Sequence, residues 1–285
     1  MGGFSMKIAR IQTENGSTYV VAARDGAWTP VSEAGIGAVS LPELTTHGAA
    51  LAELAGLASG TIIDPALLHP ALGTGKILAI GRNYVAHASE LGNARPVSPM
   101  IFSKFTSSVN DPFGVIELNA GLTQQGDYEA ELAIVIGREA KLVSPEEALT
   151  FIFGYAVAND VSARDAQHAD GQFDRSKGFD TFCPIGPWIT TADEVDASAL
   201  SVSSWVNGEQ RQSGNTRDLI FDLPFLISYI TRGTTLYPGD IILTGTPAGV
   251  GKGLNPPKFL ADGDVVTCEV EGLGRIENRV RVVLA

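Results

Sequence analysis

From residue 76 onward the sequence is a succession of short runs rich in Val, Ile, Thr and aromatic residues, bounded by Gly, Pro, Asn or Asp. Such runs are typical of β-strands, and two helical segments, at 145–151 and 222–232, interrupt them. A parallel sheet built from βαβ units needs a helix between consecutive strands, so this pattern disfavours that architecture. We therefore expect an α+β, β-rich body of rolled mixed sheets. The runs are KILAI, PMIFSK, VIEL, YEAELAIVIG, GYAVAND, PWITT, VSSWVNG, DIILTG, DVVTCEV and RIENRVRVVL.

The first part of the chain has a different pattern. Short apolar runs over 6–31 indicate a few strands, and Leu, Ala and Glu at helical spacing over 41–57 indicate one helix. The connection at 58–75 is rich in Gly and Pro but too apolar for a flexible linker. We predict a small α/β N-terminal domain at 1–73 and a larger catalytic domain at 74–285. Because no motif in the N-terminal domain carries chemistry, we expect it to pack against the catalytic body or its lid.

The net charge excludes several classes of partner. With 20 Lys+Arg against 32 Asp+Glu, the net charge of −12 repels phosphate backbones and anionic lipid, and no basic run offsets it. We therefore expect a small-molecule substrate, no nucleic acid and no membrane.

Cys183 and Cys268 lie in apolar contexts without C-x-x-C spacing, which predicts buried free thiols. No signal peptide or membrane-spanning run is visible, so the expected location is cytoplasmic.

Acidic residues alternate along the segment 127–137. On a strand, Asp127, Glu129 and Glu131 share one face, and the apolar residues between them share the other. Carboxylates on one partly buried face repel each other unless a cation neutralises them, and hard oxygen ligands suit Mg²⁺, Mn²⁺ or Ca²⁺. A solvated outer face of an acidic protein is the alternative interpretation.

Asp160 ends an apolar run and opens a polar segment, GYAVANDVSARDAQ. Strand ends of this kind hold ligands and catalytic groups, because the sheet fixes their position. The alternative is that Asp160 or Ser162 caps a helical turn over Arg164 to His168. Both interpretations are compatible if they apply to different residues of the segment.

His87 and Glu90 are three residues apart in GRNYVAHASELG, which on a helical turn places imidazole and carboxylate side by side. A carboxylate orients the histidine and raises its basicity, as a water-activating general base requires. The Gly- and Pro-rich residues 92–99 are typical of the flank of a mobile lid. Lys177 lies in a Gly-flanked polar stretch and is a candidate anion clamp. The alternative is an ordinary His–Glu pair on a surface helix and a solvated lysine.

Six motifs in this order resemble the fumarylacetoacetate hydrolase family, in its shorter bacterial form with a small N-terminal domain. The motifs are GRNYVAHASELG, DYEAELAIVIG, GYAVANDVSARDAQ, KGFDTFCPIGPW, VNGEQRQSGNTRDLIF and LYPGDIILTGTPAGVG. The resemblance implies a β-rich catalytic body with a Mg²⁺ or Mn²⁺ site, a catalytic dyad on a lid, and a homodimer. The residues that it implies are Glu129, Glu131 and Asp160 as metal ligands, His87, Glu90 and Lys177 as catalytic residues, and Arg164, Gln167 and Thr246 as substrate contacts.

The longer animal-type members carry a fourth acidic ligand just before the catalytic histidine, where this chain has Arg82 and Asn83. The chain therefore resembles the three-carboxylate subgroup, whose members include acylpyruvate and diketo-acid sugar hydrolases, oxaloacetate decarboxylases and muconate isomerase/decarboxylases. We expect a hydrolase that cleaves a C–C bond in an acylpyruvate or related 2,4-dioxo acid and releases pyruvate or a substituted pyruvate. An oxaloacetate decarboxylase or hydroxymuconate-type isomerase/decarboxylase, and a non-catalytic metal- or ligand-binding module, are the alternatives.

Overall fold

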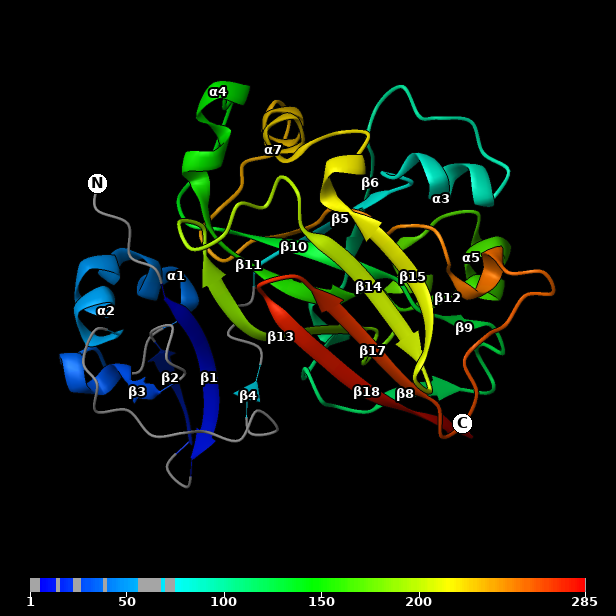
Figure 1. The fold of residues 1–285 in the computed structure, drawn as a ribbon, viewed down its shortest axis with the longest axis horizontal. Helices are drawn as coiled ribbons and strands as arrows, with labels where there is room; N and C mark the ends of the chain where they lie inside the picture. The colour runs from blue at the N-terminus through cyan, green and yellow to red at the C-terminus, as the bar shows by residue number, and fades with distance from the viewer. Residues whose placement is uncertain are drawn as a thin grey trace.

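The computed structural model describes residues 6–13, 16–22, 27–37, 40–55, 68–69 and 75–284. Over these residues an 11-stranded mixed sheet runs in the order β3-β2-β1-β13-β11-β10-β16-β5-β6, with β4 beside β1 and β7 beside β13. Its strands are β1 (Lys7–Thr13), β2 (Gly16–Ala22), β3 (Trp28–Pro30), β4 (Leu68–His69), β5 (Ile77–Gly81), β6 (Met100–Lys104), β7 (Val109–Asn110), β10 (Ala130–Ile136), β11 (Ile152–Asn159), β13 (Cys183–Thr191) and β16 (Ile241–Leu243). The β-rich, α+β fold predicted from the sequence is confirmed (Figure 1).

A second, five-stranded sheet has the order β15-β14-β17-β18-β8, and β9 pairs with β12. Their bounds are β8 (Ile116–Asn119), β9 (Gly126–Asp127), β12 (Ser162–Ala163), β14 (Ser201–Val206), β15 (Glu209–Asn215), β17 (Val265–Val270) and β18 (Gly274–Val283). The helices are α1 (Leu41–Leu44), α2 (Gly48–Ala55), α3 (Val85–Glu90), α4 (Pro145–Ala148), α5 (Arg164–Asp170), α6 (Asp174–Lys177) and α7 (Leu223–Thr231). The 3₁₀ turns are η1 (Val31–Ala34), η2 (Thr45–His47), η4 (Thr106–Ser108), η5 (Leu149–Phe151), η6 (Thr216–Asp218) and η7 (Gly251–Gly253).

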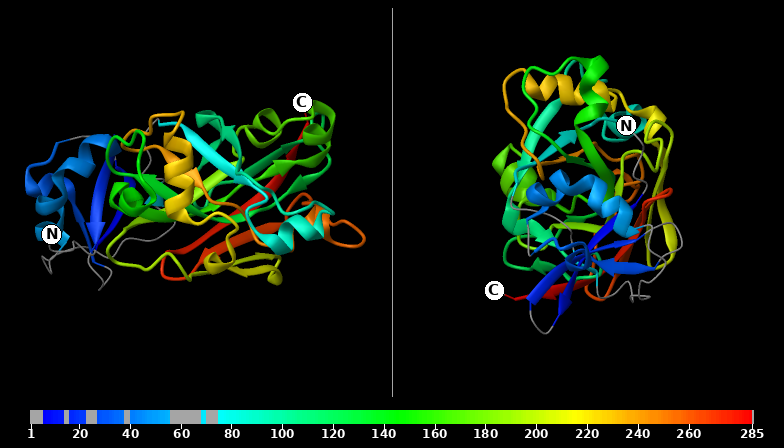
Figure 2. Two further views of the ribbon diagram at one scale, coloured as in Figure 1. Left: turned by 90° about the horizontal axis from the view of Figure 1, so that it is seen from above. Right: turned by 90° about the vertical axis from the view of Figure 1, so that its left-hand side faces the viewer.

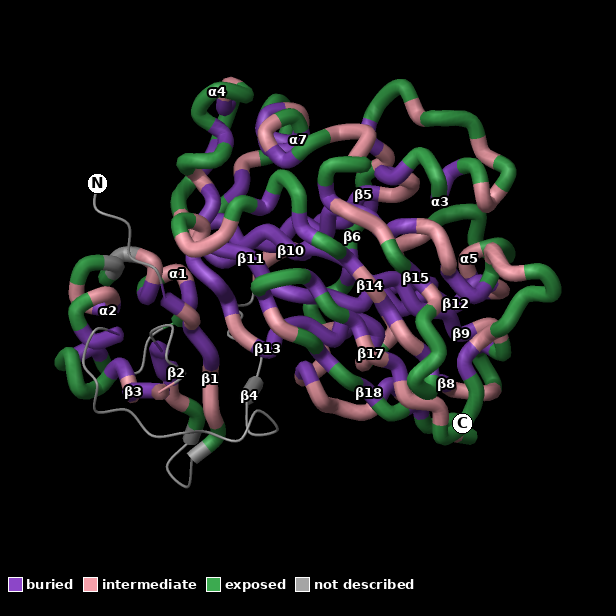
Figure 3. The backbone as a smooth tube through the Cα atoms, in the orientation of Figure 1, coloured by how far each residue is buried: buried purple, intermediate pink, exposed green. Residues whose placement is uncertain are grey.

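Strand β10 is the buried centre of the molecule (Figure 3). The alternate apolar side chains of 128–136, which is β10 with the two residues before it, belong to the largest hydrophobic cluster, together with residues of the five-stranded sheet and of α7; they are Tyr128, Ala130, Leu132, Ile134 and Ile136. The opposite face carries Glu129 and Glu131, and then the apolar Ala133 and Val135, which pack in other clusters. The predicted apolar face is therefore confirmed, and the other face is acidic only at its beginning.

The N-terminal elements extend the larger sheet, since β1 pairs antiparallel with β13 through Lys7 and Ile8. They have their own hydrophobic cluster, which includes Leu41, Leu44 and Leu51 and reaches Ile189 of the body. Figure 2 shows these elements at one end of an elongated molecule. The predicted boundary at residue 73 and most of the connection at 58–75 lie outside the described residues, so the domain division stays a prediction.

Two predicted helices are less regular than expected. The segment predicted at 41–57 is broken into α1, η2 and α2 over its described part, where residues 45–48 are Thr, Thr, His and Gly, all weak helix formers. The segment at 145–151 turns into a 3₁₀ helix, in which the Thr150 hydroxyl donates to the Glu147 carbonyl at 2.6 Å. Ser144 is the N-cap of α4 but makes no capping bond.

Helix α7 (Leu223–Thr231) agrees with the helix predicted at 222–232. Asp222 is its N-cap and accepts a hydrogen bond from the Phe225 N–H at 2.9 Å. This helix covers the larger core together with α4. None of the helices in the described segments is long and apolar enough to cross a membrane.

Candidate active site

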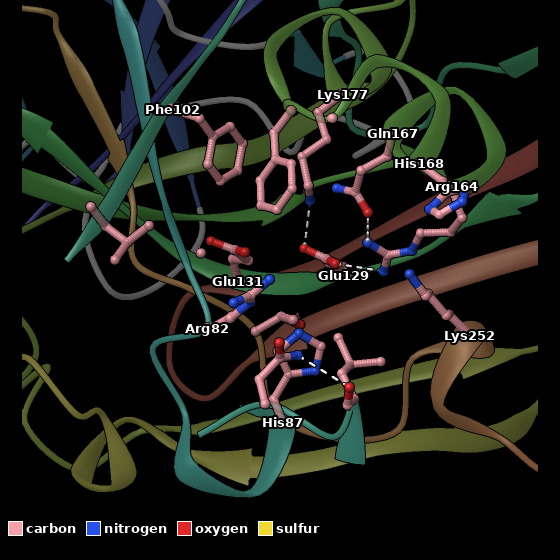
Figure 4. A pocket seen from close by; sticks show the side chains of 17 residues that line it. Arg82, His87, Phe102, Glu129, Glu131, Arg164, Gln167, His168, Lys177 and Lys252 are labelled. Atoms are coloured by element: carbon pink, nitrogen blue, oxygen red, sulfur yellow. Dashed lines mark hydrogen bonds and ion pairs between the residues drawn. The ribbon is translucent and has the colours of Figure 1, made fainter. Parts of the chain in front are cut away.

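A cavity of about 320 Å³ opens beside the acidic end of β10 (Figure 4). Its walls come from segments far apart in the sequence: β5 and α3, β6, β10, α5 with α6, and the glycine-rich segment after β16. Of the predicted site residues, those that line it are His87, Glu129, Glu131, Arg164, Gln167, Lys177 and Thr246. Asp160 and Glu90 do not line the cavity directly, but each contacts a residue that does. Asp160 bonds to Lys177, and Glu90 lies beside His87.

Glu129, Glu131 and Asp160 converge, with one oxygen of each within 4.8 Å of the others. Backbone pairing holds them together, because Asp160 follows β11 directly and its N–H donates to the Glu129 carbonyl at 2.8 Å. All three side chains are buried. The alternative of a solvated outer face is therefore wrong for these residues.

Cations neutralise most of this buried charge. The Lys177 Nζ donates to Glu129 Oε2 at 2.8 Å and to Asp160 Oδ2 at 2.6 Å. The Arg164 Nη2 donates to Glu129 Oε1 at 2.6 Å. Although burial alone raises the pKa of Glu129, Lys177 and Arg164 hold this pKa well below its usual range. Glu129 is therefore ionised at neutral pH.

Lys104 is a further buried cation that bonds to these carboxylates, and it was not predicted from the sequence. Its Nζ donates to Asp160 Oδ1 at 2.6 Å and also to the carbonyls of Val161 and Lys177. The available signal was the alternation in MIFSK, which places Phe102 and Lys104 on the same, buried face of β6. A lysine on the inner face of a strand needs a buried anion as its partner.

Glu131 differs from its neighbours because no cation bonds to it among the described residues. Its Oε2 accepts a hydrogen bond from the Gly245 N–H at 2.7 Å, whereas Oε1 accepts none from the described part of the chain. Burial, and then the charges of Asp160 and Glu129, raise the pKa of Glu131 well above its ordinary value.

The carboxylate cluster, which we define as Asp127, Glu129, Glu131 and Asp160, thus has four carboxylates against the three cations Lys104, Arg164 and Lys177. With every group ionised, the excess negative charge falls on Glu131, which lines the cavity. Three convergent carboxylates with this excess are a hard-oxygen donor set that fits Mg²⁺ or Mn²⁺. Glu129, Glu131 and Asp160 are therefore the candidate metal ligands.

Asp127 does not join this donor set, although strict strand alternation placed it on the same face. It belongs to β9, and the residues between β9 and β10 break the regular strand. Its carboxylate accepts hydrogen bonds from the Arg164 Nε at 2.9 Å, the Gly251 N–H at 2.7 Å and the Lys252 N–H at 3.0 Å. Asp127 therefore fixes the position of Arg164 and of the turn η7.

His87 and Glu90 lie side by side on α3, as their spacing predicted, with Nδ1 and Oε2 3.3 Å apart. His87 is only 4% exposed and faces the cavity, unlike a pair on a solvated helix. The other oxygen of Glu90 accepts a hydrogen bond from the Gly249 N–H at 2.8 Å. Gly253 leaves room for this carboxylate, since a Cβ there would lie 2.2 Å from the Glu90 Cδ.

Gln167 and Thr246 complete the lining. The Gln167 Oε1 lies 3.5 Å from the Arg164 Nη1, and the amide bonds to no other residue in the described part of the chain. The Thr246 hydroxyl donates to the Ala130 carbonyl at 2.8 Å and accepts from the Gln212 amide at 2.7 Å. Because this hydroxyl is already used, a substrate oxygen at Thr246 has to meet the backbone N–H, which bonds to no described residue.

The chain is similar to several known proteins. The profile of the Fumarylacetoacetate (FAA) hydrolase C-terminal family matches residues 76–281. A 2,4-didehydro-3-deoxy-L-rhamnonate hydrolase of Sphingomonas sp. (strain SKA58) is 44% identical over 245 residues, which are 84% of this chain and 86% of that protein.

Two solved structures cover nearly the whole chain. A fumarylacetoacetate hydrolase from psychrophilic Exiguobacterium antarcticum has a TM-score of 0.84 and 37% identity, and covers 98% of this chain and 100% of its own. A 5-carboxymethyl-2-hydroxymuconate delta-isomerase from Mycobacterium smegmatis has a TM-score of 0.77 and 36% identity, and covers 97% and 99%. Similar proteins thus include both hydrolases and isomerases. With the profile match spanning every segment that builds the cavity, the chain belongs to the fumarylacetoacetate hydrolase family.

Proposed function

We propose that this protein is a divalent-metal-dependent hydrolase that cleaves the C3–C4 bond of a 2,4-dioxo acid. The observation that carries the proposal is that one cavity brings together the carboxylate ligands and a buried His–Glu pair. A module that only binds metal requires the carboxylate ligands but does not require a buried His–Glu pair. The Sphingomonas relative supports the substrate class, since its name describes a sugar acid with oxo groups at C2 and C4.

Glu129, Glu131 and Asp160 would hold Mg²⁺ or Mn²⁺, which when bound supplies a Lewis acid for the oxygens of a 2-oxo acid. The His87 imidazole, oriented by Glu90, takes a proton from water, and the water oxygen forms a bond to C4. The C3–C4 bond then breaks, its electron pair stays on C3, and C3 takes up a proton. The products are a carboxylic acid and pyruvate or a substituted pyruvate.

Lys177 and Arg164 have donors left for this chemistry. The Lys177 ammonium has three N–H groups, and Glu129 and Asp160 use two of them. The remaining one is available for the oxyanion that develops at C4, because Lys177 lines the cavity. Arg164 and Gln167 face the substrate from α5, and Thr246 offers its backbone N–H.

An isomerase of the hydroxymuconate type is the second candidate, favoured by the similarity to the Mycobacterium smegmatis isomerase. In such a reaction His87 would only move a proton between carbons, and no water would be consumed. Decarboxylation of oxaloacetate is a further outcome on the same residues. The cytoplasmic location and the homodimer expected from the sequence stay predictions.

A coupled assay for pyruvate release from 2,4-dioxopentanoate and from oxaloacetate tests the proposal. We expect turnover of 2,4-dioxopentanoate with Mg²⁺ or Mn²⁺ and loss of turnover with EDTA. His87→Ala should keep its metal affinity and lose roughly 10²–10⁴-fold in rate, the usual scale for a general base. If the protein prefers oxaloacetate, it is a decarboxylase and not a hydrolase. If His87→Ala leaves the rate unchanged, His87 and Glu90 are not the catalytic dyad.

A further inference from the structure

Two cationic side chains that line the cavity, those of Arg82 and Lys252, do not bond to the carboxylate cluster. Arg164 and Lys177 bond to Glu129, whereas the guanidinium of Arg82 and the ammonium of Lys252 bond to no residue in the described segments. In the view of Figure 4 they lie on opposite sides of His87. They are therefore free to meet a ligand.

The position of Arg82 is set by a strained turn. Its φ of 58° is in the left-handed region, which side chains other than glycine rarely adopt. The next residue, Asn83, is fully buried and holds the turn, because its amide donates to the carbonyls of Phe221 at 3.0 Å and Thr244 at 2.8 Å. Strain that the surroundings maintain in this way is common at ligand-binding positions.

The position of Lys252 is set by Asp127, which accepts its backbone N–H at 3.0 Å and also holds the Arg164 Nε. The side chain lies at the exposed mouth of the cavity. Burial, and then the charge of Arg164, lower the pKa of Lys252, and Arg82 acts in the same direction. The mouth of the cavity is therefore locally positive in a protein whose net charge is −12.

The charges of the site indicate what these cations meet. With every group ionised, the carboxylate cluster and its three cations have a net charge of −1. A bound divalent cation would change this net charge to +1, and the carboxylate at C1 of a 2-oxo acid would bring it to zero. Arg82 and Lys252 are then left without a counter-charge, on the same cavity as the substrate. A second anionic group on the substrate would supply it.

We propose that Arg82 and Lys252 bind a second anionic group of the substrate, so that the preferred substrate is a dicarboxylic 2,4-dioxo acid. This inference rests on the proposed function for the chemistry at C1 to C4. It adds that the far end of the substrate carries a carboxylate, and it assigns that end to two specificity-determining residues.

Binding of two acids that differ only at the far end tests this inference. The acids are 2-oxoheptanedioate and 2-oxoheptanoate, which lack the C4 oxo group and are not cleaved; calorimetry with Mg²⁺ gives their affinities. Wild type should prefer the diacid, and Lys252→Met and Arg82→Met should each lower this preference about fivefold, the upper range for partly exposed ion pairs. Lys258→Met removes the same charge from an exposed position of the same segment outside the cavity, and should keep the preference.

The inference is overturned if wild type shows no preference for the diacid, or if Lys258→Met lowers the preference as much as Lys252→Met. Pyruvate release from 2,4-dioxoheptanedioate and 2,4-dioxoheptanoate separates this result from the proposed function. If neither compound is cleaved while the binding preference is present, the hydrolase proposal fails and the second anionic site stands. If both are cleaved with equal kcat/KM, the hydrolase proposal stands and the second anionic site fails.

Discussion

Glu131→Gln should stabilise the metal-free protein and abolish most of its stabilisation by metal. Glu131 is 2% exposed and has no cationic partner among the described residues, but Gln can still accept the Gly245 N–H through its amide oxygen. The substitution therefore removes a carboxyl group whose ionised form is buried and uncompensated, and it keeps the hydrogen bond. The expected sign is opposite to that of an ordinary substitution in a buried site.

The magnitude follows from the geometry of the donor set. Two like charges 4.8 Å apart repel by roughly 3.5 kcal/mol at an effective dielectric constant of 20, and Glu131 faces two such neighbours. Lys177 and Lys104 offset most of this repulsion through their bonds to Glu129 and Asp160. A net gain of about 2 kcal/mol is expected, which raises the melting temperature by roughly 4–8 °C for a chain of this size.

Thermal unfolding in EDTA and in saturating Mg²⁺ or Mn²⁺ measures both effects. At a metal concentration of about 100 Kd, wild type should gain roughly 2.7 kcal/mol, and Glu131→Gln less than about 1 kcal/mol. Glu269→Gln removes the same charge from an exposed strand position and should behave as wild type in both conditions. A metal-free Glu131→Gln protein that is less stable than wild type, or that gains as much from metal, would refute the reasoning.

Three further outcomes are expected. Lys104→Met leaves buried Asp160 with one cation fewer and should lower the free energy of unfolding in urea by about 3–5 kcal/mol; a loss below about 1 kcal/mol would contradict the cluster. Gly253→Ala should displace Glu90 and lower kcat about tenfold at unchanged metal affinity. Gly233→Ala, where a Cβ meets open space, is its control, and equal kcat in both variants would contradict this role of Gly253. Burial raises the pKa of Cys183 to about 12, so its thiol should resist alkylation at pH 8 until the protein unfolds. The stability from this shift is complete below pH 9.0 and is lost as the pH rises from 9.0 through about 12; rapid alkylation of the folded protein would show that Cys183 is accessible.

The parts of the site that depend on local pattern could be predicted from the sequence. Period-two alternation identified the apolar face of β10, and the spacing of His87 and Glu90 placed them side by side. The helix predicted at 222–232 forms as α7 over Leu223–Thr231. In each case the interaction is between residues a few positions apart, where backbone geometry alone fixes the distance.

The parts that depend on tertiary pairing could not be predicted from local pattern. Lys104 reaches Asp160 only because β6 and β11 belong to one sheet, and no spacing in the sequence reports that register. Strict alternation makes Asp127 equivalent to Glu129, but the break between β9 and β10 turns it toward Arg164 and η7. The alternation rule fails where a strand is interrupted, and the interruption here depends on the pairing of β9 with β12.

The most direct test of the proposed hydrolysis follows the oxygen of water during turnover of 2,4-dioxopentanoate with Mg²⁺ in H₂¹⁸O. If His87 directs water to C4, each acetate formed should carry one ¹⁸O atom in its carboxylate, and acetate and pyruvate should appear in equal amounts. Acetate without ¹⁸O, or loss of 2,4-dioxopentanoate without pyruvate, would contradict metal-dependent C–C hydrolysis at this site.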